Sequence, residues 1–447
     1  MDSFDTIAAI ATANGIGSIS IIRLSGKDAL PLALTLSKRT NLNPRLATLS
    51  SIYNSEDEII DEALLIYFKN PNSFTGEDIV EFQCHGGIAI SNIILNELIK
   101  LGARLANPGE FSKRAFLNNK IDLSKAEAIA KLIEARSEDA VKLLARQLKG
   151  ELTNFVNDIR EDLLFMLAYT EVSIDYAEDD LPADIFEQIE KKIEKIVVKL
   201  SDTLESSKRR EGLIEGFKVA IIGKPNVGKS SLLNKLLNFD RAIISDIAGT
   251  TRDTIEESVK IGTHIIKIVD TAGIREASDT IERIGIEKSL SAVNEADIII
   301  SLFDNSKVCD DEDKKILNIL DEIEYKEKIV VLNKIDLESK FDKTQLKNEY
   351  IELSTKNSIS ILVKKIETIL DNNSHDDNMT LISKRQVDAV EQTLYHVQEA
   401  KTPLMTGELE FFAHNIHEAI ENISLITRPY ENDQMLDVMF GAFCLGK

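Results

Sequence analysis

A glycine-rich loop after a short apolar segment is the feature of this sequence best suited to chemistry. Residues 223–230 read Gly-Lys-Pro-Asn-Val-Gly-Lys-Ser and fit the pattern GxxxxGK[ST]. Glycines let backbone N–H groups wrap the phosphates of a nucleotide, Lys229 reaches the β- and γ-phosphates, and the Ser230 hydroxyl is a ligand for Mg²⁺. A strand expected over 217–222 and a helix expected over 231–237 supply the required context. Alone, the loop fits an ATPase as well as a GTPase.

Three further elements, the first two at the end of an expected strand, indicate guanine. Residues 270–273 form a DxxG element, whose aspartate would hold Mg²⁺ through water and whose glycine amide would sense the γ-phosphate. Residues 333–336 form an NKxD element, and the Asp336 carboxylate can accept from both N1–H and the 2-amino group of guanine. Adenine lacks both donors, so ATP would leave polar groups unpaired. Residues 354–356, Ser-Thr-Lys, occupy the base-contact loop. Together they predict a doubly wound α/β G domain with nucleotide at the carboxyl ends of its strands.

Hydrolysis also requires an oriented water, and the position that often carries glutamine is Ile274 here, which cannot orient one. The nearest downstream carboxylates are Glu276, Asp279, Glu282 and Glu287. In the expected switch loop, 249–253, Thr251 would give a second hydroxyl to Mg²⁺. Arg252 is a candidate arginine finger, with a surface arginine as the ordinary alternative. Asn226 is placed to ligate a monovalent cation, although it also fits a residue that caps the loop.

Composition limits the class of protein. The chain has 447 residues, a net charge of −22 and three widely spaced cysteines. A protein that gripped RNA mainly through its own phosphate contacts would usually be basic, so a partner or local patch would supply much of the grip. The cysteine spacing favours neither a disulfide framework nor a zinc site. No apolar run approaches the ~20 residues of a membrane span, and a cytoplasmic location is expected.

Periodicity divides the chain into four segments. Strands expected over 18–24, 63–68 and 78–84 and a helix over 88–101 predict an α+β domain over residues 1–118. Apolar residues at helical spacing predict long helices over 119–215 and again over 373–447. The G domain, 216–372, would then be inserted in a bundle made by both helical segments.

At this point the sequence resembles the MnmE (TrmE) family of tRNA modification GTPases, over essentially the whole chain. The terminal pentapeptide Phe-Cys-Leu-Gly-Lys departs from the family only in leucine for the usual isoleucine. The shared strings are GKPNVGKSS (223–231), GTTRD (249–253), DTAGIREASD (270–279), NSFTGED (72–78), HGG (85–87), PGEFSKRAF (108–116) and the terminal FCLGK (443–447). The resemblance implies a multidomain α+β and α/β protein: an N-terminal folate-binding-like domain, a long-helix bundle and an inserted Ras-like P-loop GTPase domain.

The resemblance also implies a function. Such proteins form homodimers through the N-terminal domain and join a flavin-containing MnmG (GidA)-like partner in a heterotetramer. Together they add a (carboxymethyl)aminomethyl group to C5 of the tRNA wobble uridine, using a 5-formyl- or methylene-tetrahydrofolate, with tRNA held largely by the partner. Arg23, Glu81, Lys120 and Lys447 match the folate contacts. Arginine and lysine can meet folate carboxylates, and Glu81 can accept from pterin amino groups. Taken alone, Glu81 also fits a strand carboxylate and the basic residues fit solvated surface charges.

For the G domain, the resemblance implies K⁺-dependent dimerisation across the nucleotide faces. Glu282 matches the residue that orients the catalytic water, which accounts for Ile274, and K⁺ would be held by Asn226, Ser245, Ile247 and Thr250. The predicted catalytic residues are Glu282, Arg252 and Lys229. The predicted nucleotide-binding residues are Asn226, Val227, Gly228, Lys229, Ser230, Ser231, Ser245, Asp246, Ile247, Ala248, Gly249, Thr250, Thr251, Asp270, Thr271, Ala272, Gly273, Asn333, Lys334, Asp336, Ser354, Thr355 and Lys356.

Three alternatives stay open. Cys444 would attack C6 of a uridine, help to hold folate, or be inert. A second alternative is that the chain is a regulatory or ribosome-assembly GTPase without a direct modification role. A third is that it is a folate-dependent methyltransferase in which GTP is only structural.

Overall fold

The computed structural model describes most of the chain, in two compact units. The described residues are 5–13, 15–135, 137–175, 184–239, 257–269, 293–323, 326–374, 379–428, 433–441, 443 and 446. The first unit comprises Met1–Ala130, Gly150–Asp175 and Ala413–Lys447, and the second comprises Lys131–Lys149 and Tyr176–Phe412.

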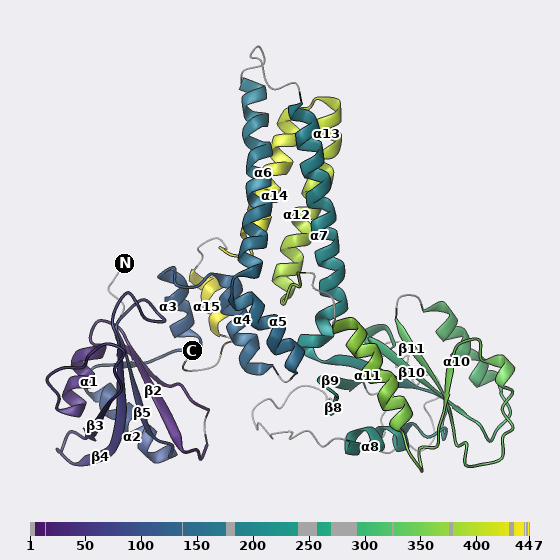
Figure 1. Ribbon diagram of the computed structural model, residues 1–447, viewed down its shortest axis with the longest axis horizontal. Coiled ribbons are helices and arrows are strands. Elements are labelled where there is room, and N and C mark those ends of the chain that lie inside the picture. Colours follow the sequence, from purple (N-terminus) through teal and green to yellow (C-terminus); the bar gives the residue numbers. More distant parts are fainter. Residues whose placement is uncertain are drawn as a thin grey trace. The chain divides into compact units, whose positions relative to one another are not determined.

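The first unit contains a six-stranded sheet in the order β3-β4-β5-β2-β1-β6 (Figure 1). Its strands are β1 (Ile7–Ile10), β2 (Ile19–Ser25), β3 (Thr48–Tyr53), β4 (Ile59–Phe68), β5 (Ile79–His85) and β6 (Arg104–Leu105). Neighbours are antiparallel except β1 and β6. Apolar side chains of one sheet face pack beneath α1 (Ala29–Ser37) and α2 (Ile88–Lys100). The three predicted strands and the predicted helix are confirmed.

Helices from distant parts of the sequence meet in the first unit. These helices are α3 (Glu110–Leu117), α4 (Leu123–Glu134), α6 (Glu151–Asp175), α14 (Leu409–Ser424) and α15 (Asp433–Gly441), with the unit boundaries inside α4 and α14. Leu123 and Ala126 of α4 share an apolar cluster with Leu436 and Phe440 of α15. The C-terminal helix therefore packs on the helix that follows the N-terminal α+β segment.

The second unit contains a six-stranded sheet in the order β12-β11-β10-β7-β9-β8, parallel except for the β8–β9 hairpin. Its strands are β7 (Phe217–Ile222), β8 (Glu257–Ile261), β9 (His264–Val269), β10 (Ile298–Asp304), β11 (Glu327–Asn333) and β12 (Tyr350–Glu352). Central β10 is buried at every position, as a parallel strand covered on both faces must be.

Helices cover both faces of this sheet. α8 (Lys229–Phe239) and α11 (Ser360–Ser374) pack into one apolar cluster, and α10 (Asp311–Glu322) packs into the other. A 3-10 turn, η1 (Lys343–Gln345), precedes β12. The predicted doubly wound α/β architecture is confirmed, and β7 lies where the strand order reverses.

The remaining helices of the second unit are α5 (Glu138–Leu148), α7 (Ile185–Glu215), α12 (Lys384–Glu399) and α13 (Lys401–Thr406). α7 precedes the sheet in sequence, α12 follows it, and the two helices run side by side (Figure 1). The sheet is thus inserted in sequence between helices that contact each other. Among the described residues, no helix combines the length and the apolar character that crossing a membrane would require.

Candidate functional site

The glycine-rich loop joins β7 to α8 at the carboxyl edge of the second sheet. Gly223 has φ 155°, Gly228 has φ 112°, and Asn226 has φ 64°. A Cβ on Gly228 would lie 2.3 Å from Nδ2 of Asn333. Only glycine therefore fits at position 228, because a side chain would meet both an unfavourable φ and a buried amide.

Lys229, the first residue of α8, turns its ammonium into the loop. Its Nζ donates to the carbonyl oxygens of Gly223, at 2.5 Å, and of Lys224, at 3.0 Å. Burial lowers the pKa of Lys229. The lysine therefore lies within the curve of the loop that would receive phosphates, with carbonyl groups as its present partners.

Asn333 ties the glycine-rich loop to the base-contact loop. Its side chain is fully buried, and Nδ2 donates to the Val227 carbonyl at 2.7 Å and to Thr355 Oγ1 at 3.2 Å. Its Oδ1 accepts from the Thr355 N–H at 2.9 Å. One amide at the end of β11 thus fixes the distance between a phosphate-binding segment and a base-binding segment.

Lys334 makes a second link to the glycine-rich loop. Its Nζ donates to the Asn226 carbonyl at 2.7 Å and to Oδ2 of buried Asp304, the last residue of β10, also at 2.7 Å. Burial alone would raise the pKa of Asp304, but hydrogen bonds from Lys334 and Ser306 outweigh it and lower the pKa. The carboxyl edges of β7, β10 and β11 are therefore joined through polar side chains.

Asp336 lies at the exposed rim, beside the base-contact loop. Ser354 Oγ donates to its Oδ1 at 2.7 Å, and Lys356 Nζ lies 3.8 Å from its Oδ2. The Ser354 hydrogen bond lowers the pKa of Asp336. The carboxylate is consequently ionised at neutral pH and oriented by Ser354, as an acceptor for two base donors requires.

The remaining described nucleotide-site residues lie nearby. Val227 is buried, whereas Ser230 and Ser231 are exposed in the first turn of α8. The structure brings the predicted segments 226–231, 333–336 and 354–356 to one sheet edge. Predicted site residues outside the described part of the chain are Ser245, Asp246, Ile247, Ala248, Gly249, Thr250, Thr251, Arg252, Asp270, Thr271, Ala272, Gly273, Glu282, Cys444 and Lys447.

In the first unit, Arg23 and Glu81 form a cross-strand ion pair. They are register partners on β2 and β5, with Arg23 Nη2 2.8 Å from Glu81 Oε1. The Arg23 guanidinium lies 5.9 Å from the ring centroid of Phe74 and 5.7 Å from that of Phe111. Its Nη1 also donates to the Gly446 carbonyl at 3.5 Å, so the C-terminal segment reaches this pair.

Lys120 is exposed, and its side chain lies against Gly76, where a Cβ would be 2.9 Å from Lys120 Cε. Gly76 follows Phe74 by two residues, so this loop connects Lys120 to the Arg23–Glu81 pair. A separate pocket of about 340 Å³ opens where β1 and β5 end and where β2 and α2 begin. Its lining includes Thr12, Ser20 and Ser91, but neither Arg23 nor Lys120.

Sequence reasoning did not identify Asp304, although it partners Lys334 at the sheet edge. The signal that could have found it is a polar residue that ends a largely apolar strand, as Asn333 also does. The contact of Lys224 with Asp310 and Asp313 was also missed, because 86 and 89 residues separate the partners.

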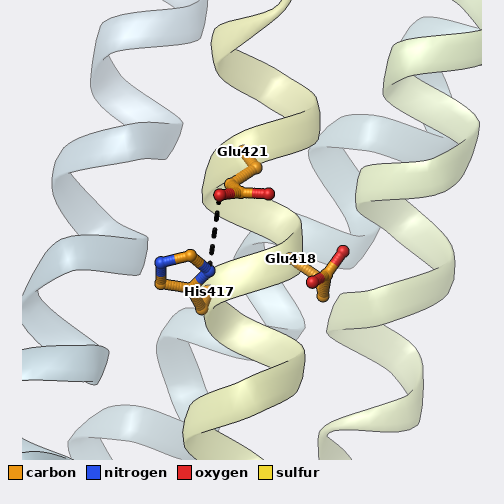
Figure 2. A group of neighbouring side chains, drawn as sticks. All are labelled: His417, Glu418 and Glu421. Atoms are coloured by element: carbon orange, nitrogen blue, oxygen red, sulfur yellow. Dashed lines mark ion pairs between the residues drawn. The ribbon is translucent and has the colours of Figure 1, made fainter.

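A His–Glu group on α14 was likewise not predicted. His417 Nδ1 lies 3.8 Å from Glu421 Oε1, and Glu418 offers a third ligand atom within 4.8 Å. Figure 2 shows His417 and Glu421 one turn apart, with Glu418 at a neighbouring position around the helix. His417 is exposed, and a pair one turn apart is also an ordinary ion pair on a helix surface, so we assign no metal to it.

Comparison with known proteins decides the family. The family model described as MnmE helical domain matches residues 123–444, and that of the GTP-binding protein TrmE N-terminus matches residues 6–120. The tRNA modification GTPase MnmE of Aliarcobacter butzleri is 75% identical over 443 residues, which cover 99% of each chain. MnmE of Sulfurimonas denitrificans is 60% identical over 100% of both chains. The chain belongs to the MnmE family of tRNA modification GTPases.

Membership of the MnmE family confirms the resemblance found in the sequence and the predicted GTPase activity of the P-loop class. Membership of a GTPase family implies GTP as the substrate and Mg²⁺ as its cofactor. Among solved structures, a variant of Era from Aquifex aeolicus bound to GDP·AlF4⁻ is 29% identical, covering 40% of this chain and 66% of that one. The TM-score of 0.27 is too low to support an inference.

Proposed function

We propose that this GTPase drives, with a flavin-containing MnmG-like partner, the addition of a (carboxymethyl)aminomethyl group to C5 of the tRNA wobble uridine. A tetrahydrofolate one-carbon unit would supply the added carbon. The nucleotide site would comprise residues 226–231, 333–336 and 354–356 with the predicted residues outside the described part of the chain. Family membership supports the tRNA reaction, and the observation that supports the nucleotide site is the Asn333 amide, which links Val227 of the glycine-rich loop to Thr355 at one sheet edge.

Each described segment has a distinct role in this proposal. Lys229 would leave the carbonyls of Gly223 and Lys224 and pair with the β- and γ-phosphates. Asp336, already oriented by Ser354, would accept from guanine N1–H and the 2-amino group. Because adenine lacks these donors, the arrangement favours GTP over ATP.

The proposed site would hold two cations. The exposed Ser230 hydroxyl directly follows Lys229 and is the oxygen donor that Mg²⁺ prefers, with Thr251 as the second proposed hydroxyl ligand. The exposed side chain of Asn226 leaves an amide oxygen for K⁺, while its backbone carbonyl is taken by Lys334. The bound cations would neutralise charge on the phosphates. Ser245, Ile247 and Thr250 complete the proposed K⁺ set.

For hydrolysis, we assign Glu282 to orient water and Arg252 to stabilise developing charge. The support is the family membership together with Ile274, whose side chain cannot hydrogen-bond to water. The deciding experiment measures GTP hydrolysis in K⁺ and in Na⁺ at equal ionic strength, with wild type and Glu282→Ala. A K⁺-specific rate that the variant loses, with GDP binding retained, supports the proposal.

Equal rates in the two salts would refute the K⁺ role, and an unaffected Glu282→Ala would refute the role of Glu282. A matched control is Glu338→Ala, because Glu338 is an exposed carboxylate of the same unit, 3.6 Å from Lys340 Nζ. Its loss should change neither the rate nor its K⁺ dependence.

For the first unit, we propose that Arg23, Glu81, Lys120 and Lys447 bind the folate and that homodimers form through residues 1–118. The Arg23 guanidinium of this pair lies 5.9 and 5.7 Å from the ring centroids of Phe74 and Phe111 and donates to the Gly446 carbonyl, next in sequence to the proposed Lys447. The pair offers a cationic donor for a carboxylate and an acceptor for pterin N–H groups. Aromatic rings beside it suit a flat heterocycle.

Binding of 5-formyltetrahydrofolate to wild type, Arg23→Ala and Glu81→Ala tests this site by calorimetry. The exposed pair Lys38–Asp57, 2.8 Å apart in the same unit, supplies the control variant Lys38→Ala. Folate binding that both site variants lose and the control keeps supports the proposal. No folate binding by wild type would favour the alternative, a regulatory GTPase without a direct modification role.

The homodimer, the MnmG-like partner in a heterotetramer and the cytoplasmic location remain parts of the same proposal. The net charge of −22 fits a complex in which the partner carries most of the tRNA-binding surface. Cys444 keeps a proposed role either as a nucleophile toward uridine C6 or in folate binding. Comparing tRNA modification by wild type and Cys444→Ser tests this role. Unchanged modification in the variant would show that the thiol takes no part.

A further inference from the structure

Lys224, the second residue of the glycine-rich loop, is a buried lysine with no role in the nucleotide contacts proposed above. Its side chain is 6% exposed, and Nζ lies 2.6 Å from Oδ2 of Asp310 and 2.6 Å from Oδ2 of Asp313. Burial alone would lower the pKa of Lys224, but the hydrogen bonds that its ammonium donates to the two aspartates outweigh burial and raise the pKa. The lysine is therefore charged at neutral pH.

The two aspartates are a rigid anchor because they also cap α10. Asp310 Oδ1 accepts from the backbone N–H groups of Glu312 and Asp313, and Asp313 Oδ2 accepts from the Asp310 N–H. The Asp313 side chain is 1% exposed, and among the described residues its Oδ1 has no hydrogen-bond partner. A carboxylate buried in this way depends on Lys224 for its compensation.

Stability of the fold does not account for such a pair. Replacing a buried ion pair by uncharged groups of similar volume is often neutral or stabilising, because desolvation offsets the attraction between the charges. What the pair does provide is a fixed distance between the start of the loop and the first turn of α10.

That fixed distance matters when Lys229 changes partners. Its Nζ now donates to the carbonyls of Gly223 and Lys224. In the proposed site these hydrogen bonds are given up or weakened when the ammonium pairs with a phosphate. The C-terminal half of the loop stays hydrogen-bonded to Asn333 and Lys334 through the carbonyls of Val227 and Asn226. The N-terminal half of the loop is then held by the Lys224 side chain.

We propose that Lys224 is a positioning residue for nucleotide binding, which anchors the start of the glycine-rich loop to Asp310 and Asp313 so that Lys229 can leave the loop for the phosphates. This inference rests on the proposed nucleotide site. Without the anchor, the loop occupies its phosphate-binding shape for only part of the time, and the apparent affinity falls by that fraction.

The test uses the double variant Lys224→Met/Asp313→Asn. Methionine resembles the lysine stem in length, and asparagine retains an acceptor for the Asp310 N–H. A single substitution would strand a buried charge and risk unfolding. The matched control is Lys347→Met/Asp321→Asn, which removes an exposed pair 2.7 Å apart, one partner of which is also on α10.

Stopped-flow binding of a fluorescent GDP to the full-length protein separates association from dissociation. For the double variant we expect the dissociation constant to rise about 10-fold, mainly through slower association, because fewer molecules present the competent loop. The melting temperature of the nucleotide-free protein should stay near that of the control variant.

Wild-type affinity in the double variant, or an equal loss in the control, would overturn the inference. A melting temperature far below the control's would make the role structural and overturn it too. Lys229→Ala separates the two proposals. If Lys229→Ala binds GDP normally, the nucleotide site is wrong; if it loses binding while the double variant does not, only the role of Lys224 fails.

Discussion

Substitution of Gly228 by alanine tests the packing of the nucleotide site most severely. The new Cβ would lie 2.3 Å from Asn333 Nδ2, whereas ordinary contacts begin near 3.4 Å. Asn333 is fully buried and cannot retreat without giving up its bonds to Val227 and Thr355. The φ of 112° adds a second cost, because side chains rarely adopt it.

The magnitude follows from these contacts. Two or three buried hydrogen bonds of Asn333 contribute about 0.5–1.5 kcal/mol each, and a disfavoured φ costs about 1–3 kcal/mol. The bound form of the loop should therefore lose at least about 2 kcal/mol. At about 1.4 kcal/mol per tenfold, GDP affinity falls about 30-fold or more.

Gly102, in the first unit, provides a control for the cost of a comparable φ to folding stability, away from the nucleotide site. Its φ is 111°, and no atom lies within 4 Å of the position its Cβ would take. Titration with fluorescent GDP should show a loss of affinity for Gly228→Ala and none for Gly102→Ala. Affinity of Gly228→Ala within about threefold of wild type would refute the reasoning, since the clash would then have been absorbed without cost.

Two further predictions concern ionisable groups. The pKa of Asp304 lies below its ordinary value of 3.8 because hydrogen bonds from Lys334 and Ser306 outweigh burial. Ionised Asp304 therefore stabilises the fold above that value, and the stabilisation is lost as pH falls through the folded-state pKa. The difference in urea midpoint between wild type and Asp304→Asn should be constant above about pH 5 and shrink below about pH 4; a constant difference would contradict the assignment. Burial, together with the charge of Asp61, raises the pKa of the Cys84 thiol to about 11. Iodoacetamide at about pH 8 should therefore alkylate Cys84 far more slowly in the native protein than in the urea-unfolded protein. Peptide mass spectrometry measures the two rates. Equal rates would mean that the thiol is accessible.

Sequence alone predicts those parts of the site that are local in the chain. The glycine-rich loop and the NKxD element each combine a strand end with adjacent polar residues, so their order predicts their meeting at one sheet edge. Strand alternation likewise predicts β2, β4 and β5, because one buried face imposes a period of two.

Contacts that depend on tertiary register could not be predicted. The pairing of Arg23 with Glu81 requires the alignment of β2 with β5, and nothing near either residue specifies it. Lys224 reads as a solvated loop lysine until the start of α10 is placed beside it. Asn333 was predicted as a base-site residue, but its bond to Val227 depends on the packing of two parallel strands against β10.

In the proposed site, Asp336 recognises guanine at the carboxyl edge of the second sheet, and the nucleotide specificity of Asp336→Asn tests this most directly. An asparagine can still accept from N1–H, but its amide N–H₂ faces the 2-amino group of guanine and instead suits the 2-oxo group of xanthine. In competition binding, wild type should prefer GDP over XDP, and the variant should prefer XDP over GDP. Unchanged preference for GDP in the variant would contradict the account, because the base would then be recognised elsewhere.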